Sequence, residues 1–544
     1  MKRKTLLALL LAAGAASAHA AQISPPVIQW QRSFRGTNLE FHACVRQLPD
    51  GGYVVGTITL SPPGGNKTSV WNGSYDMWLL RLDSRGEKLW ERSFGGTNSE
   101  FLIDLQVTAD GGLVLVGDSH SPTSESKAAP NFGNSDYWML KLDGEGRQLW
   151  DKTYGGTGFD RAMCVVQMSD GGFALGGFSY SPASGNKSST NFHASPYFGG
   201  DSWIVRTDAV GNMIWDRSLG GTSEDASWSL YETAGGGIMV ANESRSSVSG
   251  NKTTASLGAY DYWVTRLDAA GNMVDERAYG GGGDDFQVRI KPAGDGGFIL
   301  AGNSSSPPDA GKTAPYFGGQ TGPTSPRHGD FWLVKVDSSG NRAWDRSFGG
   351  DSVEILYDTI VEPDGSIVGC GISFSGTSGN KVSSGFVPGD AWIVKLDGNG
   401  DKLWELCLGG SGGDSASSIR RTTDGGYIVA GSSSSNPSGN KTSPAYGMGD
   451  LWIIKLGPDA LTAPQVRAVA QSAESIRTDG FRLEVRPPPN APTNALYVLE
   501  ASTNMTHWEA IRTNPLPADA SAVEFRDAAA TNRPSRFYGA RMER

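Results

Sequence analysis

Short runs of alternating apolar and polar residues, each ended by turn-forming residues, fill most of the chain. Residues 99–108 and 112–119 form one pair of such runs, separated by Asp110-Gly111-Gly112. Asp-Gly between two alternating runs is typical of a β-hairpin. A long polar loop follows, and then runs at 136–143 and 147–154 are joined by an Asp-x-x-Gly turn. The pattern predicts a unit of four antiparallel strands.

The same four-strand pattern recurs along the chain. Segment 82–96 closely matches segment 142–156, and a Gly-rich turn, most often Asp-Gly-Gly, precedes the second strand of each copy. The third strand of each copy begins with Asp-x-Trp, whose aspartates are Asp76, Asp136, Asp201, Asp261, Asp330, Asp390 and Asp450. We therefore count seven copies of one repeat.

The two ends of the repeat region indicate how the copies are arranged. Residues 27–34 match the fourth strand of the repeat, and residues 451–456 match the third. The N-terminal strand can therefore complete the last copy, which closes a ring of blades but has no use in a linear solenoid. We predict an all-β protein in which residues 27–457 form a seven-bladed β-propeller of four-stranded blades, closed by the N-terminal strand.

In this closure, region 27–457 resembles WD-repeat propellers. Its Asp-x-x-Gly-x-x-x-Trp phrase is also similar to the tryptophan-docking motif of quinoprotein-like propellers, with one residue fewer between Asp and Trp. Both resemblances imply an architecture, and neither implies an activity.

The composition changes after the repeats. Residues 458–463 are expected to be a linker, and residues 464–544 are richer in Arg and Pro. Candidate strands in this part are 481–486, 496–501, 508–512, 523–526 and 537–541, separated by Pro and Asn clusters. They predict a small β-sandwich that resembles fibronectin type III and other accessory modules of secreted bacterial proteins.

The first 20 residues have the pattern of a secretory signal peptide. Lys2-Arg3-Lys4 precede a short apolar run, and Ala18-His19-Ala20 form a small-residue cleavage site. No later run approaches the 18 apolar residues that a membrane-spanning helix needs. We expect a monomer that is secreted, periplasmic or at the cell surface, with no membrane span.

The net charge and the positions of the cysteines limit the partners and the disulfides that we expect. The net charge of −10 gives no reason to expect binding of nucleic acid, which needs a basic surface. An exported protein with four cysteines invites disulfide pairing. However, the repeat places Cys44 and Cys164 two blades apart, and Cys370 and Cys407 on strands separated by a third. Neither pair can be bridged in that register, so we expect no disulfide.

Two sets of charged residues recur in every copy of the repeat. An acidic residue lies four positions after the second Gly of each Gly-Gly connection or its equivalent: Glu40, Glu100, Asp160, Asp225, Asp285, Glu354 and Asp414. A lysine lies in each long loop: Lys67, Lys127, Lys187, Lys252, Lys312, Lys381 and Lys441. These ladders could bind a polyanion or a metal. Sevenfold repetition favours a structural ring in which each lysine pairs with an acid or a backbone carbonyl.

Motifs for cofactors and metals are missing from the sequence. The Gly-Asn-Lys-Thr loops lack the helix that a phosphate-binding P-loop requires. There is no Asp-x-Asp-x-Asp calcium loop, His-Glu-x-x-His or Cys-x-x-Cys. We expect neither a cofactor nor a metal.

Positions at which the copies differ are better candidates for function. On the innermost strand, the register that holds Cys44 and Cys164 carries Asp104, Arg289 and Asp358 in other blades, and Arg289 and Asp358 are expected to pair. The long loops differ in their aromatic residues, which could bind a sugar or a protein or could only hold their own loops. The candidate binding residues are Phe132, Tyr197, Phe198, Tyr316, Phe317, His328 and Tyr446.

The first hypothesis is therefore a non-catalytic binding or scaffolding propeller that holds a glycan or an extracellular protein on its long-loop face. The alternative is a polysaccharide-active enzyme, such as a glycoside hydrolase (endoglucanase-like) or a lyase. It would use two carboxyl groups about 5–10 Å apart, and the sequence singles out no such pair. A quinoprotein dehydrogenase is a third reading, which depends only on the imperfect docking motif.

Overall fold

The computed structural model describes residues 23–124, 126–193, 200–309, 311–318, 329–386, 389–447 and 449–461, together with six strands of the C-terminal region. Residues Val27–Pro458 form one compact unit, and the segment from Asp459 belongs to a second. The expected signal peptide, residues 1–20, lies outside the described residues.

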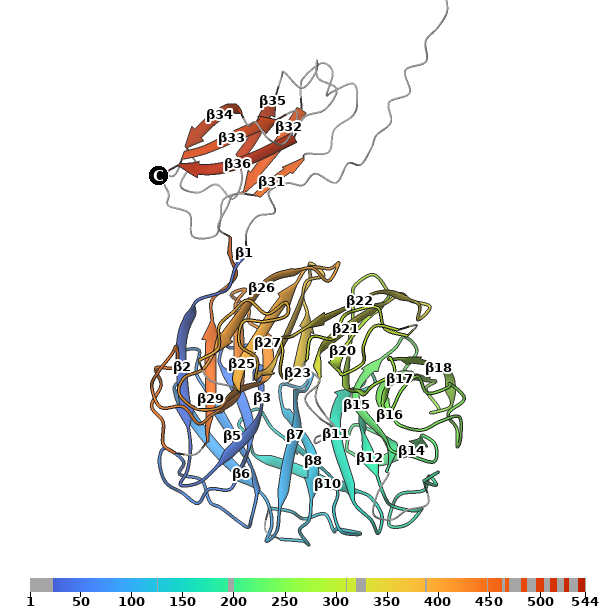
Figure 1. Ribbon diagram of the computed structural model, residues 1–544. Coiled ribbons are helices and arrows are strands. Elements are labelled where there is room, and N and C mark those ends of the chain that lie inside the picture. Colours follow the sequence, from blue (N-terminus) through green and yellow to red (C-terminus); the bar gives the residue numbers. More distant parts are fainter. Residues whose placement is uncertain are drawn as a thin grey trace, which may run out of the picture. The chain divides into compact units, whose positions relative to one another are not determined.

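The first unit is a seven-bladed β-propeller, as predicted: seven antiparallel sheets of four strands each (Figure 1). The strands of the first three blades are β3 (Glu40–Gln47), β4 (Tyr53–Thr59), β5 (Asp76–Leu82), β6 (Lys88–Phe94); β7 (Glu100–Val107), β8 (Leu113–Ser119), β9 (Asp136–Leu142), β10 (Gln148–Tyr154); and β11 (Asp160–Gln167), β12 (Phe173–Ser179), β13 (Asp201–Thr207), β14 (Met213–Leu219). Those of blades four to six are β15 (Asp225–Glu232), β16 (Ile238–Ser244), β17 (Asp261–Leu267), β18 (Met273–Tyr279); β19 (Asp285–Pro292), β20 (Phe298–Ser304), β21 (Asp330–Val336), β22 (Arg342–Phe348); and β23 (Glu354–Val361), β24 (Ile367–Ser373), β25 (Asp390–Leu396), β26 (Lys402–Leu408).

The seventh blade combines strands from both ends of the propeller. It contains β27 (Asp414–Arg421), β28 (Tyr427–Ser433), β29 (Asp450–Leu456) and, as its fourth strand, the N-terminal β2 (Ile28–Phe34). β2 pairs antiparallel with β29, and Phe34 lies opposite Leu451. The predicted closure by the N-terminal strand is confirmed.

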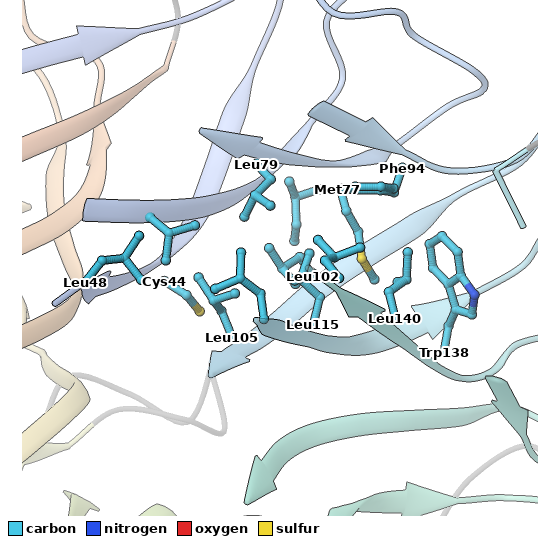
Figure 2. Packing of buried hydrophobic residues seen from close by; sticks show 14 residues of the cluster. Cys44, Leu48, Met77, Leu79, Phe94, Leu102, Leu105, Leu115, Trp138 and Leu140 are labelled. Carbon is cyan, nitrogen blue, oxygen red and sulfur yellow. The ribbon is translucent and has the colours of Figure 1, made fainter. Parts of the chain in front are cut away.

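The third strand of every blade carries one tryptophan that is at most 1% exposed, and together these form a ring of large buried side chains: Trp78, Trp138, Trp203, Trp263, Trp332, Trp392 and Trp452. Figure 2 shows one contact between blades, in which Leu102 and Leu105 of β7 pack with Met77 and Leu79 of β5. Apolar residues on facing sheets thus fill the space between neighbouring blades, which is the main source of the propeller's stability.

The fourth-strand tryptophans also join neighbouring blades. Gly86, in the Asp-x-x-Gly turn of blade one, has a φ of 81°, which favours glycine. A methyl group at Gly86 would lie 2.6 Å from the ring of Trp30 on β2. The indole of blade seven therefore lies directly on the turn of blade one, and the contact requires both the conformation and the small size of glycine.

The second unit is also made of strands. β1 (Ile23–Ser24) pairs with β30 (Ala460–Leu461). Two three-stranded sheets have the orders β31-β32-β35 and β34-β33-β36. Their strands are β31 (Gln465–Ala468), β32 (Phe481–Arg486), β33 (Leu496–Ser502), β34 (Glu509–Pro515), β35 (Val523–Asp527) and β36 (Phe537–Glu543). Five of them overlap the predicted strands, and β31 was not predicted. In the described parts of the chain, no helix has the length and apolarity to cross a bilayer.

Candidate functional site

The seven acidic residues of the ladder are at most 1% exposed and begin the innermost strand of each blade. In blade three, Asp160 Oδ2 accepts hydrogen bonds from the Gly156 amide at 2.8 Å and the Ser181 hydroxyl at 2.7 Å. The amide contact with a glycine recurs at Glu40, Glu100, Asp225, Asp285, Glu354 and Asp414. These carboxyl groups hold the connections between blades and are closed off from solvent.

Each ladder acid has a second carboxyl group beside it, from the Asp-x-Trp phrase of the preceding blade. A methyl group on Gly155 would lie 1.9 Å from Asp136 Oδ1 and 2.8 Å from Asp160 Oδ2, so this glycine is flanked by both carboxyl groups. Burial, with the neighbouring carboxylate adding to it, raises the pKa of Asp136 to about 7 and that of Asp330 to about 8. These pairs are therefore partly protonated at neutral pH.

The ladder lysines are at most 3% exposed. In blade three, Lys187 Nζ donates to the Ser189 carbonyl at 2.9 Å and to the Ser218 hydroxyl at 2.7 Å, and it lies 5.2 Å from the ring centroid of Trp203. Backbone carbonyls also accept from Lys67, Lys127, Lys252, Lys312, Lys381 and Lys441. Each lysine holds its own long loop against its blade, beside the buried tryptophan or the neighbouring strands. Neither ladder therefore opens into a shared cleft.

The candidate aromatic residues of the long loops do not gather at one place. Phe132 and Phe317 donate their backbone amides to Asp136 and Asp330, at 2.5 and 2.7 Å. The ring of Phe132 lies against Gly185 of the next blade. Tyr316 contacts Gly318 of its own loop, whereas Tyr446 is 44% exposed. Tyr197, Phe198 and His328 lie outside the described residues.

A surface that differs among the blades lies at the strand ends of blades one to three, on the long-loop face. We call it the aromatic arc: Phe41, Tyr75, Phe101, His120, Phe159, Phe178 and Tyr180, all partly exposed. Ring centroids are 5.7 Å apart for Phe41 and Tyr75, 5.2 Å for Tyr75 and Phe101, and 6.0 Å for Phe101 and His120. His120 continues to Phe159 at 5.7 Å, and Phe159 to Tyr180 at 6.0 Å. The rings form one continuous row across three blades.

Arg161 holds the centre of the aromatic arc. Its guanidinium lies 5.0 Å from the ring centroid of Phe101 and 5.1 Å from that of Phe159. Its Nε donates to Oδ1 of the buried Asp118 at 2.7 Å, and His120 Nε2 lies 3.3 Å from Oδ2 of the same carboxylate. The arc is thus pre-organised, and it offers a cation and an imidazole beside its rings.

At the corresponding strand ends, other blades have different side chains. In blade four, Arg245 lies 5.6 Å from the ring of Tyr260, whose hydroxyl donates to Glu224. Blade seven has Gly413 and Ser434 instead. The aromatic arc therefore does not belong to the repeat that builds the ring.

The innermost strands of all seven blades surround a central cavity of about 90 Å³. Arg46 donates to Asp104 at 2.9 Å, and Arg420 donates to Asp358. Although burial would raise the pKa of Asp358, Arg420 and the other cations of the cavity lower it to about 2.

Asp104, Arg289 and Asp358 all line this cavity, but the expected pair of Arg289 with Asp358 is wrong. Arg289 instead donates to the carbonyls of Trp228 at 2.5 Å and Tyr357 at 3.2 Å. The correct partner, Arg420, lies two positions beyond the compared register. Side chains two residues apart on a strand point to the same side, so the sequence offered this signal.

The four cysteines are free and buried. Cys44 and Cys164 line the cavity from blades one and three, and Cys370 and Cys407 lie on β24 and β26, with β25 between them. Across the described residues, no cluster of three or more His, Cys, Asp or Glu residues could hold a metal ion.

No family model matches this chain. It is 26% identical over 191 residues to the regulatory protein FlaEY of Caulobacter vibrioides, a match that covers 34% of this chain and 20% of that protein. The chain thus spans about a fifth of the length of this curated relative.

Solved structures with some likeness include a puromycin hydrolase (TM-score 0.36, 14% identity, 77% of this chain and 54% of that chain). A glycoside hydrolase has a TM-score of 0.22 and 10% identity, with 93% of this chain and 94% of that chain covered. Likeness at this level carries no argument for an activity.

Proposed function

We propose that this protein is a non-catalytic binding propeller that acts outside the cytoplasm and holds a glycan on its long-loop face, at the aromatic arc. The observation that carries this proposal is the row of partly exposed rings from Phe41 to Tyr180, which runs across blades one to three. Flat aromatic faces stack on the apolar faces of sugar rings, and the charged groups beside them can bond hydroxyls. Arg161 and His120 stand in that position.

Rigidity supports the choice of the aromatic arc over the long loops. The rings are held by strand ends and by the ion pair of Arg161 with Asp118, so little side-chain freedom is lost when a ligand binds. The loop residues Phe132 and Phe317 instead pack within and between the loops.

The alternative, a polysaccharide-active enzyme, needs two accessible carboxyl groups about 5–10 Å apart. The ladder acids supply neighbouring carboxyl groups, but none is more than 1% exposed. This burial is the reason for preferring binding over catalysis.

The architectural resemblances complete the proposal. We propose that the ring belongs with WD-repeat and quinoprotein-like propellers, supported by the closure through β2 and by the contact of Trp30 with Gly86. The second unit is proposed to be a fibronectin type III-like accessory module, supported by its two three-stranded sheets.

The test is a screen of the full-length mature chain against soluble polysaccharides, measuring both binding and released reducing ends. For a polysaccharide that binds, Tyr75→Ala and Tyr180→Ala are each expected to weaken affinity roughly tenfold, the equivalent of about 1.4 kcal/mol. Phe374→Ala is the matched control, because Phe374 occupies the position of Tyr180 in blade six and is 40% exposed.

Binding without release of reducing ends, lost in the arc variants and kept in the control, would support the proposal. Release of reducing ends would overturn it in favour of the enzyme. Equal affinity of all three variants would remove the aromatic arc as the site. Capture of a protein, with no polysaccharide bound, would replace the glycan by a protein partner.

A further inference from the structure

The central cavity contains more positive than negative charge. Its lining includes four basic side chains, Arg46, Arg289, Lys291 and Arg420, and two carboxylates, Asp104 and Asp358. Both carboxylates form ion pairs, Asp104 with Arg46 and Asp358 with Arg420. Among the described residues, no carboxylate lies within ion-pair distance of Arg289 or Lys291.

Asp104 and Asp358 are further engaged by backbone groups. Asp104 accepts the Leu105 amide at 2.8 Å, and Asp358 accepts the Thr359 amide at 2.9 Å. These bonds hold both carboxylates on their own strands. They are therefore not free to turn toward Lys291.

Two hydrogen-bond donors at the cavity lack an acceptor among the described residues. Within the described part of the chain, the ammonium of the partly exposed Lys291 has no side-chain or backbone partner, and the buried indole Nε1–H of Trp228 has no acceptor. The guanidinium of Arg289 is 5.6 Å from the centroid of the Trp228 ring, and Arg289 lies on the same strand as Lys291, β19. Buried donors without acceptors are rare in proteins, and they often mark the place of a ligand or a water.

The innermost strand of every blade has a bulge, and in β19 it lies between Phe286 and Arg289. Gln287 within it has a φ of 58°, in the left-handed region, and His42 at the same position of blade one has a φ of 52°. What distinguishes β19 is therefore its side chains and not its backbone. No other innermost strand carries a basic residue at both the Arg289 and the Lys291 position.

We propose that the central cavity binds a small inorganic oxyanion of the phosphate type, held by Lys291 and Arg289 with the indole N–H of Trp228 as a further donor. A cavity of about 90 Å³ far exceeds the roughly 10–15 Å³ that one water molecule needs by the same measure, so it has room for a single tetrahedral oxyanion. A bound anion would offset the excess positive charge and supply acceptors to donors that have none. This site is separate from the aromatic arc and does not depend on the glycan proposal.

The cavity also weakens the hold of Lys291 on its proton. Burial lowers the pKa of Lys291 to about 8, and the charges of Arg420, Arg289 and Arg46 add to this effect, whereas Asp358 opposes it. An oxyanion beside the ammonium would restore its preference for the charged form.

The test is isothermal titration calorimetry of the full-length mature chain with sodium phosphate, against sodium chloride at matched ionic strength. Saturable binding of one phosphate per chain is expected for the wild type. Lys291→Gln is expected to weaken it at least tenfold, and Lys291→Arg should retain it because the charge is kept. Lys152→Gln is the matched control, since Lys152 bonds only the exposed Asn212.

Absence of saturable phosphate binding to the wild type would overturn the proposal, as would equal affinity in Lys291→Gln. If Lys291→Gln fails to fold, the line width of the phosphorus-31 signal of phosphate with the wild-type chain gives the answer. Broadening that excess sulfate reverses would support an oxyanion site, and an unbroadened signal would refute it. Loss of polysaccharide binding alone would leave the phosphate result unchanged.

Discussion

Nε of Arg35 lies 3.7 Å from Oδ1 of Asp450, so the end of the N-terminal strand meets the start of the last propeller strand through an ion pair. The same nitrogen lies 3.9 Å from Oε2 of Glu40. Arg35 stands where the other six junctions have a glycine between two carboxyl groups: Gly95, Gly155, Gly220, Gly280, Gly349 and Gly409. The junction that closes the ring thus carries a fixed positive charge at a position where the others have glycine.

Arg35→Gly is expected to lower the free energy of unfolding at pH 8, although it restores the residue found at the other junctions. It leaves Glu40 and Asp450 buried without their cation, which should cost about 2–3 kcal/mol. At pH 5 the cost should shrink, because burial raises the pKa of Glu40 to about 7 and also raises that of Asp450. Urea unfolding at the two pH values measures this.

The control for this experiment is Arg32→Gln, which removes the exposed ion pair with Glu87. Exposed pairs contribute about 0–1 kcal/mol, so its effect should be small at both pH values. If Arg35→Gly were equally destabilised at pH 5 and pH 8, the charge explanation would be wrong and lost packing would replace it.

The paired carboxyl groups predict that the propeller is more stable at pH 5 than at pH 8. Their folded-state pKa values lie above the unfolded values near 4, so the folded state binds more protons between pH 4 and 8. Stability is therefore fully present below the unfolded pKa and is lost as the pH rises through the folded one. The pKa is raised to about 6 for Asp285, about 7 for Asp76, Asp136 and Asp201, and about 8 for Asp330.

Urea unfolding midpoints at pH 5, 6.5 and 8 would measure this slope. Asp330→Asn should flatten it, because that variant removes one titrating group of a pair. Asp337→Asn, at an exposed turn with a lowered pKa, is a control that should leave the slope between pH 5 and 8 unchanged. Stability that increases from pH 5 to pH 8 would contradict the assignment.

Most of the propeller could be predicted because each blade repeats the information for its own strands. Seven Asp-x-Trp phrases and seven turns indicate one register, and the match of residues 27–34 to a fourth strand predicts the closure, which β2 makes. The second unit has no repeat, and β31, only four residues long, was missed there.

The aromatic arc was harder to predict because its residues lie at strand-end positions where individual blades differ from the rest of the repeat. Phe101, Phe159 and Tyr180 occupy three different positions of the repeat, and only the ring brings them together. The aromatic residues predicted as binding residues in the long loops include Phe132 and Phe317, which pack within and between the loops. Comparing the copies position by position at the strand ends would have found the aromatic arc.

The cysteines are expected to be unreactive in the folded protein. Burial raises the pKa of Cys44 and of Cys164 to about 12, and the thiolate is the reactive form. An aromatic disulfide reagent at pH 8 should titrate no thiol in the native chain and four in urea, since all four cysteines are free. Two or fewer thiols in urea without reductant would show a disulfide and contradict this prediction.

A further prediction concerns Gln31 of β2, the strand that closes the ring. Its Oε1 accepts from Trp452 Nε1 at 3.1 Å, and its Nε2 donates to the Asn440 carbonyl at 2.9 Å. Gln31 Oε1 also accepts the loop amide of Thr442 at 3.0 Å. In blade one the two bonds to the loop are divided between two side chains: Glu91 accepts from the loop amides, and Lys88 donates to the Asn66 carbonyl. Ile28 occupies the position of Lys88 in blade seven and cannot donate.

Gln31→Glu alone should therefore destabilise the propeller by about 1–3 kcal/mol, because a buried carboxylate would face the Asn440 carbonyl and leave it without a donor. Ile28→Lys combined with Gln31→Glu recreates the arrangement of blade one and should recover most of that loss. A double-mutant cycle in urea measures the coupling, expected between about 0.5 and 3 kcal/mol. Additive effects would mean that Gln31 does not replace the Lys–Glu pair of blade one and makes no coupled contribution to the closure of the ring.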